Sequence, residues 1–115
     1  MSSSRATLRF SYDNNTQTVW IAPFSQGLWE FSCVSFISVK DVNDFPQFLL
    51  AMVLQDSASN RRGFWCIEKL GDKYVLEAMH NIPEVLLTAG EFEAICRSLS
   101  RQVDKLEGAF QKAAK

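Results

Sequence analysis

The last quarter of the sequence carries one apolar stripe that recurs at helical spacing for about five turns. Its members are Phe92, Ile95, Cys96, Leu99, Val103, Leu106 and Phe110. Thr88 and Glu91 form a Thr-x-x-Glu capping box, which predicts that a helix begins at this point. A long helix with one apolar face has to bury that face against a second layer. The rest of the chain must therefore supply a sheet or helices to cover it.

The first forty residues supply three predicted strands, 7–12, 17–24 and 28–39, separated by turn-forming clusters. Pro23 is expected to end the second strand or to lie on a sheet edge, because proline cannot donate a ladder hydrogen bond. One face of the third strand is apolar, and its members are Trp29, Phe31, Cys33, Ile37 and Val39. The other face is only half polar, so we expect part of it to be covered.

A short apolar helix is predicted to follow, starting at Asp44. Asp44 and Gln47 stand three residues apart, as in a capping box, and Pro46 falls in the first turn. The helix has one apolar stripe made of Phe45, Phe48, Leu49 and Met52, with Leu50 and Leu54 on roughly the opposite side. This second apolar surface is either buried within the chain or shared between two subunits.

Residues 64–70 and 74–83 are two apolar runs joined by a Gly-Asp turn, the pattern of a β-hairpin. A polar loop, 55–63, precedes them, and its two arginines are expected to be solvated. The order of elements is strand-strand-strand-helix-strand-strand-helix. The sequence thus predicts a single domain over residues 1–115. Its expected fold is two-layer α+β, a curved antiparallel sheet of about five strands packed by two helices.

Charge and cysteine content favour a cytoplasmic protein. The formal net charge is −1, which gives no sequence-wide reason to bind nucleic acid or an anionic membrane. The three cysteines stand singly, without a Cys-x-x-Cys pair, as expected of reduced thiols. The N-terminal residues show no apolar core of a signal peptide, and residues 48–54 are far fewer than the ~20 needed to span a bilayer.

No catalytic or metal-binding motif is visible. His80 is the only histidine, and no Ser, Cys or Asp stands at a recognisable spacing from it, so a structural or surface role is the favoured interpretation. A pair formed in the folded chain between His80 and Cys66 or Cys96 stays open as an enzyme hypothesis. No glycine-rich phosphate loop occurs. We predict that the protein is not an enzyme and has no cofactor.

The surplus of apolar residues indicates a dimer or partner interface. The candidates for subunit or partner packing are Phe45, Leu49, Leu50, Met52 and Leu54. Weaker candidates for contact with a bound segment are Trp20, Phe36 and Trp65. The alternative is that the long C-terminal helix and neighbouring strands cover all of this surface.

The order of elements resembles the YbjN-like and type III secretion chaperone-like superfamily over about residues 8–110. In that family an apolar helix leads to a hairpin and then to a long C-terminal helix. The hairpin pattern is matched by Phe64, Ile67, Gly71 and Leu76, and the entry into the last helix by Leu87, Thr88, Glu91 and Phe92, with Asp104 as the late acidic residue. These domains usually begin with an amphipathic helix, whereas only residues 1–6 precede the first strand here. The surface that such a helix would shield is therefore expected to be open or covered by another subunit.

The resemblance implies a small, acidic, non-enzymatic homodimer that holds an extended partner segment by strand addition at a sheet edge. We therefore expect a chaperone-like or adaptor protein that binds a protein partner and homodimerises. The alternative is a small-ligand-binding or regulatory domain whose aromatic-rich concavity holds a small molecule.

Overall fold

A computed structural model of the chain describes residues 6–12 and 15–113; residues 1–5 and 114–115 lie outside the described part, as do residues 13–14 in the turn-forming cluster between the first two predicted strands. The elements are β1 (Ala6–Ser11), β2 (Thr16–Ser25), β3 (Leu28–Val39), α1 (Gln47–Ser59), β4 (Phe64–Leu70), β5 (Lys73–Pro83) and α2 (Ala89–Ala113), with short 3-10 turns at Val42–Asp44 and Glu84–Leu86. The predicted α+β class and element order are confirmed.

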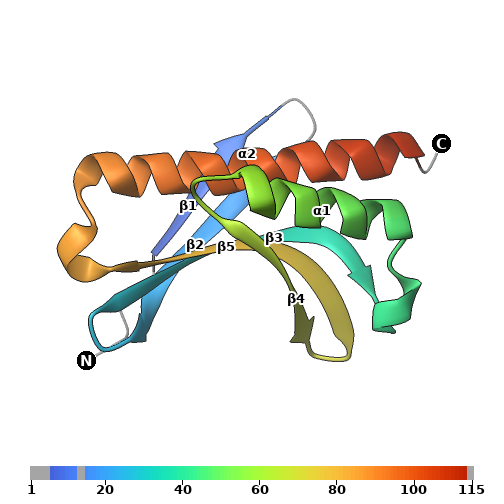
Figure 1. Cartoon of the computed structure of the whole chain (residues 1–115), viewed down its shortest axis with the longest axis horizontal. Helices are drawn as coiled ribbons and strands as arrows, with labels where there is room; N and C mark the ends of the chain where they lie inside the picture. The colour runs from blue at the N-terminus through green and yellow to red at the C-terminus, as the bar shows by residue number, and fades with distance from the viewer. Residues whose placement is uncertain (1–5, 13–14, 114–115) are drawn as a thin grey trace.

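The five strands form one antiparallel sheet in the order β1-β2-β3-β5-β4. The sheet bends into an arch, and both helices lie across its convex side (Figure 1). The bend coincides with a register shift in β3 between Val34 and Ser38, where β3 gains two residues relative to β5. Extra residues of this kind bend a strand and increase its twist. No described element covers the concave side of the arch (Figure 1).

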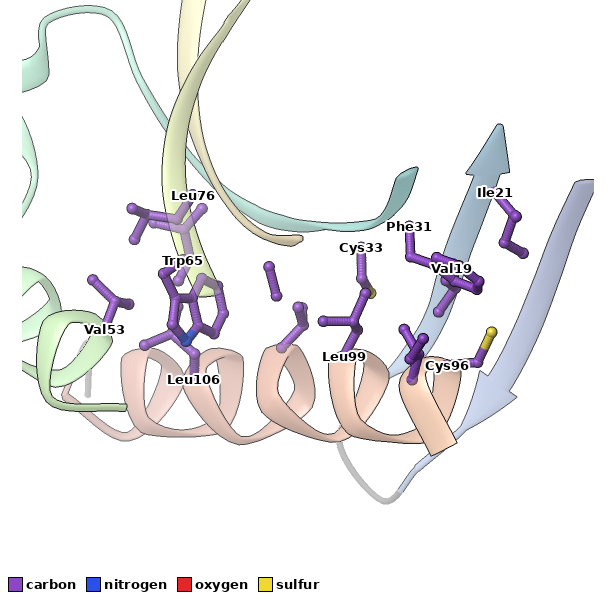
Figure 2. Close-up of a cluster of buried hydrophobic side chains, with 14 of the residues drawn as sticks. Val19, Ile21, Phe31, Cys33, Val53, Trp65, Leu76, Cys96, Leu99 and Leu106 are labelled. Atoms are coloured by element: carbon purple, nitrogen blue, oxygen red, sulfur yellow. The ribbon is translucent and has the colours of Figure 1, made fainter. Parts of the chain in front are cut away.

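The core lies between the sheet and α2. The apolar stripe of α2 behaves as predicted, since Ile95, Cys96, Leu99, Val103 and Leu106 are all buried. These side chains meet residues of β2 and β3 such as Val19, Phe31 and Cys33 (Figure 2). Full burial of a single Leu, Ile or Phe side chain stabilises a fold by roughly 1.5–3 kcal/mol. The contact between α2 and the sheet is therefore the main apolar contribution to stability.

The start of α1 differs from the prediction. The helix begins at Gln47, its N-cap is Pro46, and no side chain caps it. Phe45 precedes a proline and is extended, with φ −65° and ψ 131°. The proline ring disfavours helical geometry at that position, so the helix cannot extend back to Asp44. The predicted Asp44/Gln47 capping box is wrong, and Asp41 instead accepts a hydrogen bond from the Asn43 N–H at 2.8 Å.

The start of α2 contains half of the predicted capping box. Thr88 Oγ1 accepts a hydrogen bond from the Glu91 N–H at 3.0 Å. The Glu91 carboxylate does not return to Thr88, because it forms an ion pair with Arg62 at 2.8 Å. The predicted i,i+4 pair between Glu93 and Arg97 is present at 2.9 Å.

Candidate interaction surface

Helix α1 exposes part of its apolar side chains. Leu49 and Val53 are buried against the core, whereas Leu50 and Met52 are half-buried. Leu54 is 71% exposed and Phe48 is 43% exposed. The predicted stripe is therefore wrong at Phe48, which lies at the surface, and Val53 takes its place in the core. Of the two alternatives that the sequence left open, complete coverage within the chain does not hold for Leu54.

The exposed apolar surface of α1 continues onto β4, which is an edge strand of the sheet. Phe64, Ile67 and Leu70 of β4 are all exposed. Because side chains alternate along a strand, Ile67 lies on the α1 side of the sheet, whereas Phe64 and Leu70 lie on the concave side. A cavity of about 340 Å³ lies between the two elements, lined mainly by Leu50, Val53, Leu54, Trp65, Ile67 and Leu76. We call α1 and β4 together the α1–β4 surface. An apolar edge strand of this kind is a template for pairing with another chain.

The hydrogen-bonding groups of β4 are available over most of its length. The Trp65 N–H points away from β5, since it donates to Ser57 Oγ of α1 at 2.9 Å. N–H and C=O groups alternate in direction along an antiparallel strand, so those of Ile67 and Lys69 also face outward. Ser57 therefore covers one end of the edge and leaves the centre of β4 free to pair.

The concave side of the sheet holds a second surface. A cavity of about 450 Å³ is lined by Trp20, Ala22, Glu30, Ser32, Val34, Glu68, Leu70, Glu77 and Met79. Glu77, from β5, is only 2% exposed. Burial and the nearby Glu68 carboxyl group together raise the pKa of its carboxyl group to about 8. Glu77 is therefore largely protonated near neutral pH.

Replacing Glu77 with glutamine is expected to flatten the pH dependence of stability. The folded-state pKa lies above the unfolded value of 4.5. The stability contributed by the neutral carboxyl is therefore present below about pH 4.5 and is lost as pH rises through about 8. Glu77→Gln should match the wild type near pH 5 and exceed its free energy of unfolding by about 2 kcal/mol near pH 9.

Urea unfolding followed by circular dichroism across this pH range measures the effect of Glu77→Gln. Glu93→Gln, on the exposed side of α2, is the matched control and should leave the pH profile unchanged. A wild-type profile that is flat between pH 5 and pH 9 would contradict the raised pKa of Glu77.

The predicted contact residues separate into groups. Phe45 and Leu49 are buried in the core, so they are not available to a partner, whereas Leu50, Met52 and Leu54 reach the surface to different degrees. Trp65 is buried too, in the core cluster that also contains Val53 of α1 (Figure 2). Trp20 lies on the concave face. Phe36 is exposed beside the gap between β2 and β3, where its ring meets Phe110 edge-on.

A buried polar cluster fills this gap and was not predicted. Gln17 of β2 is not paired with β3, because β3 bulges after Val34. The Glu107 carboxylate, 3% exposed, lies in the gap. It accepts hydrogen bonds from Gln17 Nε2 at 2.6 Å, Asn15 Nδ2 at 3.0 Å and the Phe36 N–H at 2.8 Å. A pattern of apolar residues cannot reveal such a cluster, since its partners come from three distant segments.

The cysteines do not have the properties of activated nucleophiles. Burial raises the pKa of Cys66 and Cys33 to about 12 and that of Cys96 to about 11. Cys66 lies opposite Glu77 in the β4–β5 register, so these two side chains are on the same face of the sheet. Glu77 and His80 are three residues apart along β5, so the side chains of Cys66 and His80 lie on opposite faces. This placement removes a Cys66–His80 pair from the enzyme hypotheses.

No protein-family profile, curated protein or solved structure matches this chain. Among the described residues, no helix is long and apolar enough to cross a membrane. Within residues 6–12 and 15–113, no three His, Cys, Asp or Glu side chains are grouped so that they could hold a metal ion.

Proposed function

We propose that this protein is a non-enzymatic, chaperone-like or adaptor domain that homodimerises through the α1–β4 surface and holds a partner segment. The observation that carries the proposal is the edge strand β4, which no other described strand covers and whose exposed Ile67 continues the apolar residues of α1. An edge of this kind favours association unless another chain covers it.

The sequence of β4 supports a second copy of the chain as the occupant of this edge. A two-fold axis through Ile67, perpendicular to the sheet, would pair the two β4 strands antiparallel. Ile67 would then lie opposite Ile67 of the second subunit. Phe64 of each subunit would lie opposite Leu70 of the other. Lys69 would stand opposite Trp65, and Cys66 opposite Glu68, so no like charges would be opposed. The N–H and C=O groups of Ile67, which face away from β5, would form the central hydrogen bonds of such a pair.

The same arrangement would join two sheets and place both concave faces on one side. Each concave face carries Trp20 beside the cavity with Glu30 and Met79, and its middle is not covered by any described element. An extended partner segment is the ligand that fits a long, shallow sheet surface. The small-molecule alternative draws on this cavity alone and leaves the α1–β4 surface without a role.

Introducing charge into the α1–β4 surface is expected to split the dimer. Leu54→Glu and Ile67→Glu both alter exposed positions, so the fold should persist while the carboxylates oppose association. Light scattering should give twice the 13.0 kDa chain mass for the wild type and the single chain mass for the double variant. We expect the dissociation constant to rise by about a hundredfold or more.

Val85→Glu is the matched control for the double variant. Val85 is apolar and 91% exposed, and it lies after β5, outside the α1–β4 surface. This variant should remain dimeric, and circular dichroism should show native helix and strand content in every variant. A wild type that is monomeric at all concentrations would contradict the proposed dimer.

A further inference from the structure

The loop of residues 60–63 connects the two elements of the α1–β4 surface and is held by an unusual set of contacts. The Arg62 carbonyl accepts hydrogen bonds from Ser98 Oγ at 3.1 Å and Gln102 Nε2 at 2.9 Å, both on α2. The Arg62 guanidinium forms two hydrogen bonds with the Glu91 carboxylate, at 2.8 and 3.1 Å. Arg62 stays partly exposed, as expected of a solvated loop, but its ion pair with Glu91 was not predicted.

A fourth contact ties the loop to β5 and depends on a proton. The Gly63 N–H donates to Nδ1 of His80 at 3.0 Å. An imidazole nitrogen accepts a hydrogen bond only when it carries no proton, so the ring must be neutral with its proton on Nε2. A second proton on His80 would place two N–H groups against each other and abolish this bond.

We propose that His80 and the 60–63 loop form a pH-sensitive latch, which fixes the α1–β4 surface near neutral pH and releases it on acidification. The latch is local, because the loop's other bonds end on groups that do not titrate in this range or on the Arg62–Glu91 pair. The inference rests on the proposed function for its effect on the dimer, but the latch itself does not require one.

The charged groups around His80 set the range of the latch. Burial lowers the pKa of His80, the Glu91 carboxylate of α2 raises it, and the Arg62 guanidinium of the loop lowers it further. The net direction is downward from the ordinary value of 6.5. Glu91 stays charged as pH falls, because hydrogen bonds from Arg62 lower its own pKa.

The direction of the pH effect follows from these shifts. When the loop is detached, His80 regains an ordinary pKa and binds a proton more readily than in the latched state. The latch is therefore fully stable above about pH 6.5 and weakens as pH falls from there toward the lowered pKa of His80. Release would free the polypeptide between α1 and β4 and loosen the packing of α1 against the edge strand.

Nuclear magnetic resonance tests the latch directly, because this chain has a single histidine. At about pH 7.5 the 15N shifts of His80 should identify the tautomer with its proton on Nε2. The protection of the Gly63 amide against hydrogen exchange should fall by up to about tenfold between about pH 7.5 and about pH 5.5. A proton on Nδ1 at neutral pH, or a protection factor that does not change, would overturn the proposal.

His80→Asn is the decisive variant. An asparagine side chain offers an amide oxygen near the position of Nδ1, and this oxygen accepts a hydrogen bond at every pH. The variant should therefore keep the Gly63 amide protected at the lower pH, whereas equal loss of protection in variant and wild type would contradict the latch. Should the variant fail to fold, the wild-type tautomer and exchange data still decide the question.

Light scattering at both pH values separates the latch from the dimer. If the wild type dimerises, its dissociation constant should rise by about tenfold on acidification and by less than about twofold in His80→Asn. A wild type that stays monomeric at neutral pH, with the latch signals intact, would contradict the dimer and leave the latch standing. A dimer whose His80→Asn variant weakens equally would contradict the latch alone.

Discussion

Glu107→Ala is expected to lower the free energy of unfolding by about 3 kcal/mol, because it removes the acceptor that three donors share. The Glu107 carboxylate is the acceptor for Gln17 Nε2, Asn15 Nδ2 and the Phe36 N–H. The last of these is a main-chain group in the bulged part of β3, which has no strand neighbour on that side.

Glu93→Ala is the control for this prediction, since it removes a glutamate from the exposed side of the same helix. Glu93 makes only an i,i+4 ion pair with Arg97, so its loss should cost less than about 0.5 kcal/mol. Urea denaturation followed by circular dichroism compares the two variants. Equal destabilisation would show that the polar cluster contributes no more than a surface ion pair.

Glu107 also marks the limit of what the sequence could predict. The apolar stripe of α2 is readable because its members recur at a fixed interval in one segment. In the spacing of apolar residues, Gln17 and Glu107 are ordinary polar positions of two separate segments. They meet only because β3 bulges after Val34. Nothing in a single sequence announces a bulge, so a buried carboxylate on α2 could not be inferred.

The candidate surface was predictable in outline for a similar reason. The excess of apolar residues over residues 48–54 is a local property, and it identified Leu50 and Leu54. Phe45 and Leu49, which were assigned to the same surface, are both buried within the chain. The free edge of β4 depends on the strand order, in which β5 inserts between β3 and β4. The exposed Ile67 was therefore not recognised as part of the candidate surface.

The 60–63 loop illustrates the same point for polar contacts. The sequence placed a loop correctly, but the partners of Arg62 lie between 29 and 40 residues further along the chain. The single signal that could have been noticed is Gly63 itself, at the junction of a loop and a strand. Glycine at such a position often marks a close approach of the backbone to another element.

Gly63→Ala is expected to destabilise the fold by about 3 kcal/mol, because the new methyl group meets two obstacles at once. Gly63 has φ +97°, a conformation that L-residues rarely adopt. A Cβ atom there would lie 2.6 Å from Leu99 Cδ2 and 3.0 Å from Gln102 Nε2. Relief of this overlap would push the loop away from α2 and weaken the hydrogen bonds that Arg62 accepts.

Gly71→Ala isolates the conformational part of this cost. Gly71 also has a positive φ, +65°, but a Cβ atom there meets nothing within 4 Å. We expect it to cost about 1 kcal/mol. The Leu99→Ala background isolates the steric part, since it removes the Cδ2 atom, so adding Gly63→Ala there should cost clearly less than in the wild type. Thermal and urea unfolding of the four variants measure both terms, and equal costs for Gly63→Ala and Gly71→Ala would contradict close packing of the loop on α2.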